Sequence, residues 1–386
     1  MRRTFLHKII LIASASLLFL ISILTIFLSG SKQGYLPEEE LLNHLSREQL
    51  KEQLQEETEK ESEYFPENLL APFVDMVSWV DVNSNYSNNG APNLEQIYYD
   101  TGCKYFNLGF IRADSSQPTE ADGTIRWGWG GYYDLSEKGG DTFQYAGIKK
   151  SIQDIRNLGG DVIVSFGGQL GNSPWTDSNN EDKLAEMYID VINSYDLKRI
   201  DLDIEMHNQG YENNQINARA VKKAQDQTGV EVALTIPIMP YGWDEQQINL
   251  IRAYLSAGVK LSVINNMTMC YGYNGVASGE DFADASIRAL QNANRQLIGI
   301  YAEFDVQLTE EEAYKMLGAT VDIGYENSQN PIFTADMTKR VAEFAKEKNC
   351  RMYSFWSVNR DSMLEPNTGI KYQYTHYASA THYLDK

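Results

Sequence analysis

Short apolar runs alternate along the chain with longer stretches in which apolar residues recur at helical spacing. The runs predict strands over 72–76, 105–111, 161–166, 199–205, 232–236, 263–269, 321–325 and 352–356. Helices are predicted between them, over 145–158, 181–194, 214–227, 244–256, 281–302 and 334–348. Near-continuous apolar strands are typical of parallel strands that are covered by helices. Eight such strand and helix units predict an α/β fold of the (β/α)8 TIM-barrel class.

An open, doubly wound sheet is the alternative fold. Such a sheet usually carries a glycine fingerprint for a nucleotide, and the sequence after Gly167 and Gly168 lacks it. In a barrel, side chains at the carboxyl ends of the strands converge on one mouth. We expect Glu205, Met269, Tyr325 and Trp356 to lie there.

The first residues predict a membrane anchor. An uncharged run over 9–28 follows a flank that carries Arg2, Arg3 and Lys8, and about 20 apolar residues are enough to cross a bilayer as a helix. The positive flank should stay in the cytoplasm, so the rest of the chain should lie outside it. The alternative over residues 1–31 is a signal peptide cleaved after the small residues 29–31, which would release a secreted protein.

The next segment, residues 32–65, is rich in glutamate and predicts a solvated stalk with a transmembrane helix before it. Residues 66–386 remain for the main domain, which is enough for one barrel with insertions. We expect this domain to be a monomer.

Charge and cysteine content narrow the classes of function. The net charge of −20 argues against a nucleic-acid partner, because phosphate binding requires a basic surface. Three cysteines cannot form a disulfide framework. Cys103 and Cys350 precede the second and eighth predicted strands, which would place them about 10 Å apart, beyond disulfide reach. We therefore expect free thiols.

The fourth predicted strand carries the candidate chemistry. Asp201, Asp203 and Glu205 alternate with aliphatic residues, so the three carboxylates share one face of the strand. Mutual repulsion makes such a row costly, which indicates a function. Metal-assisted hydrolysis and calcium binding are alternatives, but no matching carboxylate cluster ends another strand, and calcium favours a loop. We expect no metal and no cofactor.

General acid catalysis on a sugar fits the three carboxylates best. A neighbouring carboxylate in a partly dry barrel raises the pKa of an acid in the direction that keeps it protonated near neutral pH. Glu205, furthest toward the mouth, is the predicted acid, and Asp203 is its charged neighbour.

Four motifs resemble family 18 glycoside hydrolases, the chitinase family. They are Ser165-Phe166-Gly167-Gly168 on the third strand, Asp201-Leu202-Asp203-Ile204-Glu205 on the fourth, Met267-Thr268-Met269 on the sixth and Phe355-Trp356-Ser357 on the eighth. The similarity runs from about Phe73 to Asp361. The tryptophan-rich segment 127–132 and the Lys198-Arg199 pair before the acidic strand make the chain look closest to the branch that lacks a leading Asp-Gly there.

The resemblance implies a retaining hydrolysis of β-1,4-linked N-acetylglucosamine, in which the substrate's own N-acetyl group is the nucleophile. Glu205 would be the acid and base, Asp203 would hold the acetamide, and Asp201 would support Asp203. Trp356 would form the floor under the sugar. Further substrate contacts are expected from Tyr271, Met269, Cys270, Trp129, Gly168 and Gln169, although Trp129 could instead belong to a packed loop.

One residue departs from the family pattern. Cys270 stands where the sixth-strand motif has an aspartate that positions the substrate, and a thiol is a weak hydrogen-bond partner. Two alternatives to a chitinase stay open. The resemblance also allows an endo-β-N-acetylglucosaminidase acting on glycoprotein glycans or peptidoglycan, and the subsite loops would decide between the two substrates. The change at Cys270 motivates the other alternative, a lectin-like barrel that binds sugar with little catalysis.

Overall fold

The computed structural model of the chain describes residues 50–52, 55, 62, 64–205, 210–325 and 332–361. The chain divides into two compact units, Met1–Glu48 and Gln49–Lys386, and all described residues belong to the second unit. Among them, no helix is both long and apolar enough to cross a bilayer. The predicted anchor over 1–31 and most of the predicted stalk over 32–65 lie outside the described residues, so both stay predictions.

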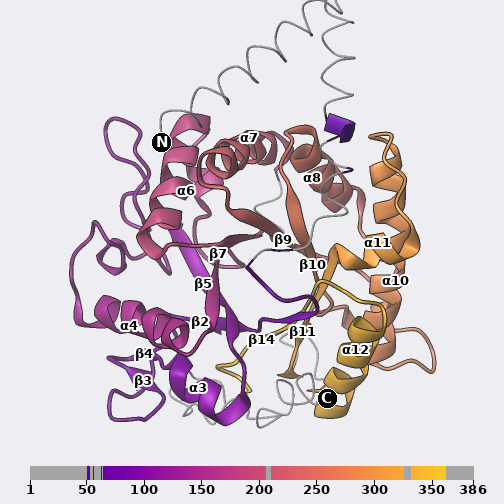
Figure 1. Cartoon of the computed structure of the whole chain (residues 1–386), viewed down its shortest axis with the longest axis horizontal. Helices are drawn as coiled ribbons and strands as arrows, with labels where there is room; N and C mark the ends of the chain where they lie inside the picture. Colours follow the sequence, from indigo (N-terminus) through magenta and orange to yellow (C-terminus); the bar gives the residue numbers. More distant parts are fainter. Residues whose placement is uncertain are drawn as a thin grey trace, which may run out of the picture. The chain divides into compact units, whose positions relative to one another are not determined.

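A curled sheet of parallel strands forms the centre of the second unit (Figure 1). The strand order is β1-β14-β11-β10-β9-β8-β7-β5-β2. The sheet closes because β1 and β2 are two halves of one chain segment, of which β1 pairs with β14 and β2 pairs with β5. The strands are β1 Leu69–Leu70, β2 Phe73–Asp75, β5 Tyr105–Ala113, β7 Asp161–Gly167, β8 Arg199–Asp203, β9 Glu231–Pro237, β10 Leu261–Met267, β11 Leu317–Asp322 and β14 Met352–Trp356.

Helices lie outside the ring of strands in Figure 1. Most connections between strands contain an amphipathic helix whose apolar face is buried against the sheet, as a TIM-barrel fold requires. The helices are α3 Leu94–Thr101, α4 Phe143–Asn157, α5 Pro174–Asp177, α6 Glu181–Tyr195, α7 Tyr211–Thr228, α8 Glu245–Ser256, α9 Gly272–Gly275, α10 Phe282–Ala302, α11 Glu310–Lys315 and α12 Ala335–Glu347, with the 3-10 helix η1 Tyr133–Leu135.

Three short antiparallel strand pairs are formed in addition to the parallel strands of the barrel. Strand β6, Trp127–Trp129, pairs with the end of β5. The other two pairs are β3 Ser87–Asn88 with β4 Ala91–Pro92, and β12 Gly324–Tyr325 with β13 Ile332–Phe333. Because each pair follows a barrel strand in the chain, these pairings shape the loops around the mouth.

The predicted TIM-barrel class and all six predicted helices are confirmed, the helices within a few residues at each end. The predicted seventh strand over 321–325 was wrong at its start, because β11 already begins at Leu317. Its second residue, Gly318, packs so closely against Asn265 that a Cβ atom there would lie 3.0 Å from Asn265 Oδ1. Glycine weakens the sequence pattern of a strand, yet here it allows the close approach of β10.

The cysteines are free thiols, as predicted. Cys103 and Cys350 are buried just before β5 and β14. Burial raises the pKa of each of these two thiols to about 12, so both stay protonated at physiological pH.

Candidate active site

The acidic strand has the alternation that the sequence predicts. Ile200, Leu202 and Ile204 are fully buried in the core between sheet and helices. Asp201 and Asp203, on the other face, are 1% and 4% exposed inside the barrel. Glu205 lies two residues beyond the end of β8 and is half-buried at the mouth. The three carboxylates therefore rise from the barrel interior toward solvent.

Asp201 is held by a polar layer that crosses the barrel interior. Its two carboxylate oxygens accept hydrogen bonds from Ser165 Oγ at 2.6 Å and from Thr235 Oγ1 at 2.7 Å. Asn265 Nδ2 donates to Thr235 Oγ1 at 2.9 Å and to Thr320 Oγ1 at 2.7 Å. These side chains come from the neighbouring strands β7, β8, β9, β10 and β11. The layer fixes Asp201 directly below Asp203.

Asp203 combines a fixed backbone with a carboxylate oxygen that is open to a ligand. Its carbonyl oxygen accepts a hydrogen bond from the Gly168 N–H at 3.0 Å. Gly167 lies so close that a Cβ atom would be 2.4 Å from the same carbonyl oxygen. Within the described residues, no hydrogen bond reaches the buried Oδ1 of Asp203. This oxygen can accept a hydrogen bond from a bound molecule.

Burial raises the pKa of all three acids. Desolvation raises the pKa of Asp201 to about 6, although its hydrogen bonds and Arg199 oppose the change. Desolvation, and then the charges of Glu205 and Asp201, raise the pKa of Asp203 well above its ordinary value. Desolvation also raises the pKa of Glu205 to about 7, against the opposing charge of Arg112. Near neutral pH, the outer two acids can hold a proton for transfer.

Trp356 forms an aromatic wall at the mouth. It ends β14, is half-buried, and stacks on Phe110 with ring centroids 5.7 Å apart and planes 25° apart. Phe73 packs against Phe110 and Trp356, with centroids 6.2 Å from each. The rings hold the indole in place, so its exposed part can support the apolar face of a sugar.

Asp322, at the end of β11, is a residue that the sequence reasoning missed. It pairs in register with Trp356, so the two side chains share the inner face. Its carboxylate forms an ion pair with Arg360 and lies 3.9 Å, Oδ2 to Sγ, from Cys270. Cys270 itself is exposed, with a left-handed φ of 56°. The carboxylate that the sixth strand lacks is therefore present on the seventh.

Arg112 and Asp75 were also missed. Arg112, near the end of β5, donates from Nε to the Gly167 carbonyl at 2.8 Å and interacts electrostatically with Asp75, Asp203 and Glu205. The signal in the sequence was weak: each charge closes or follows an apolar strand, as Asp203 does. A pattern within one strand cannot show which strand ends will meet.

The other predicted contact residues have mixed positions. Met269 is half-buried, Gln169 is exposed and Gly168 is buried against Phe110. Tyr271 is 4% exposed and belongs to the main apolar core, so its contact with a sugar stays a prediction.

The prediction that Trp129 contacts the sugar is wrong. It is fully buried, donates from Nε1 to Tyr195 Oη at 2.9 Å and packs edge-on against the ring of Tyr195. The antiparallel pairing of β6 with β5 turns this ring into the core. Trp129, at the end of β6, is therefore packed in the core and offers no surface for a sugar.

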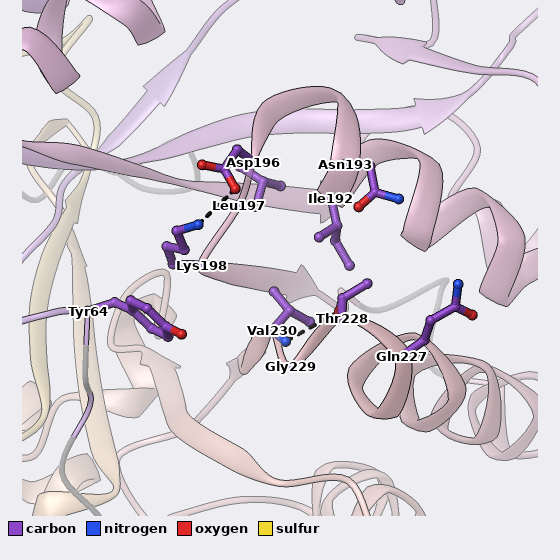
Figure 2. Close-up of a pocket in the computed structure, with 10 residues that line it drawn as sticks. All are labelled: Tyr64, Ile192, Asn193, Asp196, Leu197, Lys198, Gln227, Thr228, Gly229 and Val230. Carbon is purple, nitrogen blue, oxygen red and sulfur yellow. Dashed lines mark hydrogen bonds and ion pairs between the residues drawn. The ribbon is translucent and has the colours of Figure 1, made fainter. Parts of the chain in front are cut away.

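A separate hollow lies at the opposite end of the barrel strands (Figure 2). Its volume is about 300 Å³, and its lining comes from the segments that precede β8 and β9, with Tyr64 at one side. Lys198 in this hollow is paired with Asp196 at 2.8 Å. None of the three acids lines it, so the geometry of the acids, and not this hollow, defines the candidate site.

The chain is similar in sequence to known chitinases. The chain is 28% identical over 316 residues to a probable bifunctional chitinase/lysozyme of Escherichia coli, and 28% identical over 311 residues to endochitinase 11 of Metarhizium anisopliae. Each match covers 77% of this chain. The chain spans only 31% and 53% of the length of these two relatives. No protein-family model matches the chain.

The chain is also similar to solved structures of chitinases. The catalytic domain of a hyperthermophilic chitinase from Pyrococcus furiosus is 26% identical, with a TM-score of 0.66 over 83% of this chain and 95% of that domain. A family 18 chitinase from Chromobacterium violaceum, at 19% identity and a TM-score of 0.50, shares the fold. These similarities confirm the resemblance of this chain to the chitinases of glycoside hydrolase family 18.

Proposed function

We propose that this barrel is a retaining glycoside hydrolase that cleaves β-1,4-linked N-acetylglucosamine in chitin or chito-oligosaccharides. One observation carries the proposal: Asp201 and Asp203 on β8 and Glu205 just beyond it alternate along the chain and end at the barrel mouth, in surroundings that raise their pKa values. A stack of acids with graded exposure suits proton transfer to a glycosidic oxygen. The similarity to chitinases supports this choice of substrate.

In the first step, protonated Glu205 gives its proton to the leaving glycosidic oxygen. The acetamide oxygen of the substrate attacks the anomeric carbon as the glycosidic bond breaks, forming a cyclic cation. In the second step, the Glu205 carboxylate takes a proton from water, and that water opens the ring at the anomeric carbon. Two displacements retain the configuration, and Glu205 ends protonated as it began.

Asp203 would hold the acetamide nitrogen during both steps. Its buried Oδ1 is open to a donor, and a carboxylate there would stabilise the positive charge of the cyclic cation. Asp201, whose carboxylate is fixed by Ser165 and Thr235, would supply a negative charge below Asp203. This charge favours the protonated form of the neighbouring acids. Trp356 would support the sugar from below.

Asp322 would take over the positioning role that Cys270 cannot perform. A carboxylate accepts hydrogen bonds from sugar hydroxyl and amide groups far better than a thiol does. Asp322 lies next to Cys270 and in register with Trp356, so it faces the same part of the mouth. This placement weakens the case for a lectin-like barrel with little catalysis.

A second candidate substrate is peptidoglycan, whose glycan strands also contain β-1,4-linked N-acetylglucosamine. The name of the Escherichia coli relative, which joins chitinase and lysozyme, favours this possibility. Glycoprotein glycans are a further alternative for the same acid machinery. Product analysis on each substrate separates them.

The test compares the full chain with Glu205→Gln on chito-oligosaccharides. Loss of the proton donor should lower the hydrolysis rate by roughly 10²–10⁴ while sugar binding persists. Glu245→Gln is the matched control, because Glu245 is an exposed glutamate on α8. Hydrolysis that survives Glu205→Gln would refute the acid assignment. A wild type that binds these sugars without cleaving them would support the lectin alternative.

A further inference from the structure

The guanidinium of Arg112 is fixed beneath the loop that follows β7. Its Nε donates to the Gly167 carbonyl at 2.8 Å. A Cβ atom on Gly168 would lie 3.2 Å from Arg112 Nη2, and one on Gly171 would lie 3.1 Å from Arg112 Cδ. Both glycines have a left-handed φ of 80°. Loop and guanidinium therefore fit each other, and a side chain at either glycine would press on Arg112.

The same guanidinium contacts the aromatic wall. Arg112 Cζ lies 5.4 Å from the centroid of the Phe110 ring, and Phe110 stacks on Trp356. A cation over a ring face is attracted by the ring. Arg112 thus connects the acidic strand with the aromatic wall, where Trp356 would support the sugar. Its position is set from these two sides.

Three carboxyl groups interact electrostatically with this one cation. Asp75 from β2, with Asp203 and Glu205 from the acidic strand, attract Arg112, and the hydroxyl of Tyr132 from the loop after β6 adds a smaller contribution. Asp201 lies one layer deeper and acts on Asp203. On the far side of the mouth, Arg360 is paired with Asp322.

We propose that Arg112 is a positioning residue of the candidate site, whose fixed positive charge lets Asp203 and Glu205 share one proton instead of holding two. This inference rests on the proposed function, because the single-proton state is the one that the hydrolysis needs. Asp203 must be ionised to stabilise the cyclic cation, while Glu205 must be protonated to release the leaving group.

Without the guanidinium, the balance of protons would change. Desolvation and mutual repulsion favour two protonated acids, and the charge of Arg112 opposes both effects. Removing it should make both acids hold their protons to higher pH. The active state with one proton would then occur only at higher pH, so both limbs of a bell-shaped profile should move in the same direction.

The experiment measures kcat/KM against pH on chito-oligosaccharides for the full-length wild type, Arg112→Gln and Arg112→Lys. We expect Arg112→Gln to move both limbs upward by about one pH unit, as removal of a nearby unit charge does. Arg112→Lys keeps the charge and should restore most of the profile. Arg252→Gln, on the surface of α8, is the control and should leave the profile unchanged.

The inference is overturned if Arg112→Gln lowers the rate without moving either limb, or if Arg112→Lys moves the limbs as far as Arg112→Gln does. Either result would assign Arg112 a purely structural role. If Arg112→Gln does not fold, Asp75→Asn replaces it. With one carboxylate fewer around Arg112, both limbs should move to lower pH, and unmoved limbs would again overturn the inference.

A second readout separates this inference from the proposed function. Carbon-13 NMR of labelled carboxyl groups follows the protonation of Asp203 and Glu205 without a substrate. If the wild type cleaves no sugar, the proposed function fails, yet the titration of both acids should still move upward in Arg112→Gln. Titrations that coincide with the wild type would contradict the role of Arg112 itself.

Discussion

Cys270 and Asp322 show how a carboxylate can reach a site from a neighbouring strand. The sixth-strand motif has a thiol at the position where the family pattern has an aspartate. The seventh strand places Asp322 within 3.9 Å of that thiol and pairs it with Arg360. A carboxylate is thus present beside the position where the family motif would have one. We infer that the loss on one strand is offset by the other.

If Asp322 positions the sugar in place of Cys270, substitutions at the two positions should change kcat/KM by very different amounts. Asp322→Asn should lower kcat/KM by about 10²–10³, as the loss of one positioning group in a polar site does. Cys270→Ser should change it less than threefold, because the thiol contributes little. Steady-state kinetics on chito-oligosaccharides measures both values, with thermal unfolding as the control for loss of the ion pair between Asp322 and Arg360. A Cys270→Asp variant that is much faster than the wild type would contradict the account.

At the scale of the element, β8 is the part of the site that its own sequence predicts best. Alternation within a strand is a local property, so three acids on one face could be read directly from the sequence. The same holds for the helices, whose apolar spacing is local. Arg112 and Asp322 could not be predicted in this way, because their contacts join strands that are far apart in the sequence. Trp129 was misplaced because the pairing of β6 with β5 decides which way it faces.

The acidic strand should also make the stability of the fold depend on pH. The folded-state pKa of Asp201 is about 6, against an ordinary value of 3.8, so the folded state holds this proton more tightly than the unfolded state. As the pH rises from about 4 to about 6, the folded state must give up that proton, and stability is lost.

Asp201→Asn removes this contribution, because the amide has no proton to lose. Between pH 4.5 and pH 7.5, the variant should therefore gain about 2 kcal/mol in the free energy of unfolding relative to the wild type. Urea unfolding at the two pH values measures the difference. A constant difference between variant and wild type would show that Asp201 titrates normally in the folded barrel.

At the scale of the whole molecule, the barrel separates its functions by layer. An apolar cluster closes the lower end and includes Phe65, Ile163, Val263 and Met352. The polar layer around Asp201 lies above it, and the acids with Trp356 lie at the mouth. Inside the barrel, apolar packing thus lies at one end and the candidate chemistry at the other. The loops that surround the mouth would decide the length of sugar that binds.

The segment before the barrel gives a prediction about where the protein is located. We propose that residues 9–28 anchor the protein in a membrane with the barrel on the outer side. Deletion of residues 1–31 should move the protein from the membrane fraction to the soluble fraction without changing its activity. Recovery of the unaltered protein in the soluble fraction, shortened at its N-terminus, would favour a cleaved signal peptide instead.

Participation of the substrate's acetamide is tested by comparing hydrolysis of fully N-acetylated and fully de-N-acetylated chito-oligosaccharides by the wild-type chain. If the acidic strand works with the acetamide of the substrate as nucleophile, the acetylated oligomers are cleaved with retained configuration. The de-N-acetylated ones are then cleaved at least about 10²-fold more slowly. Equal rates on both substrates, or an inverted product, would contradict the account.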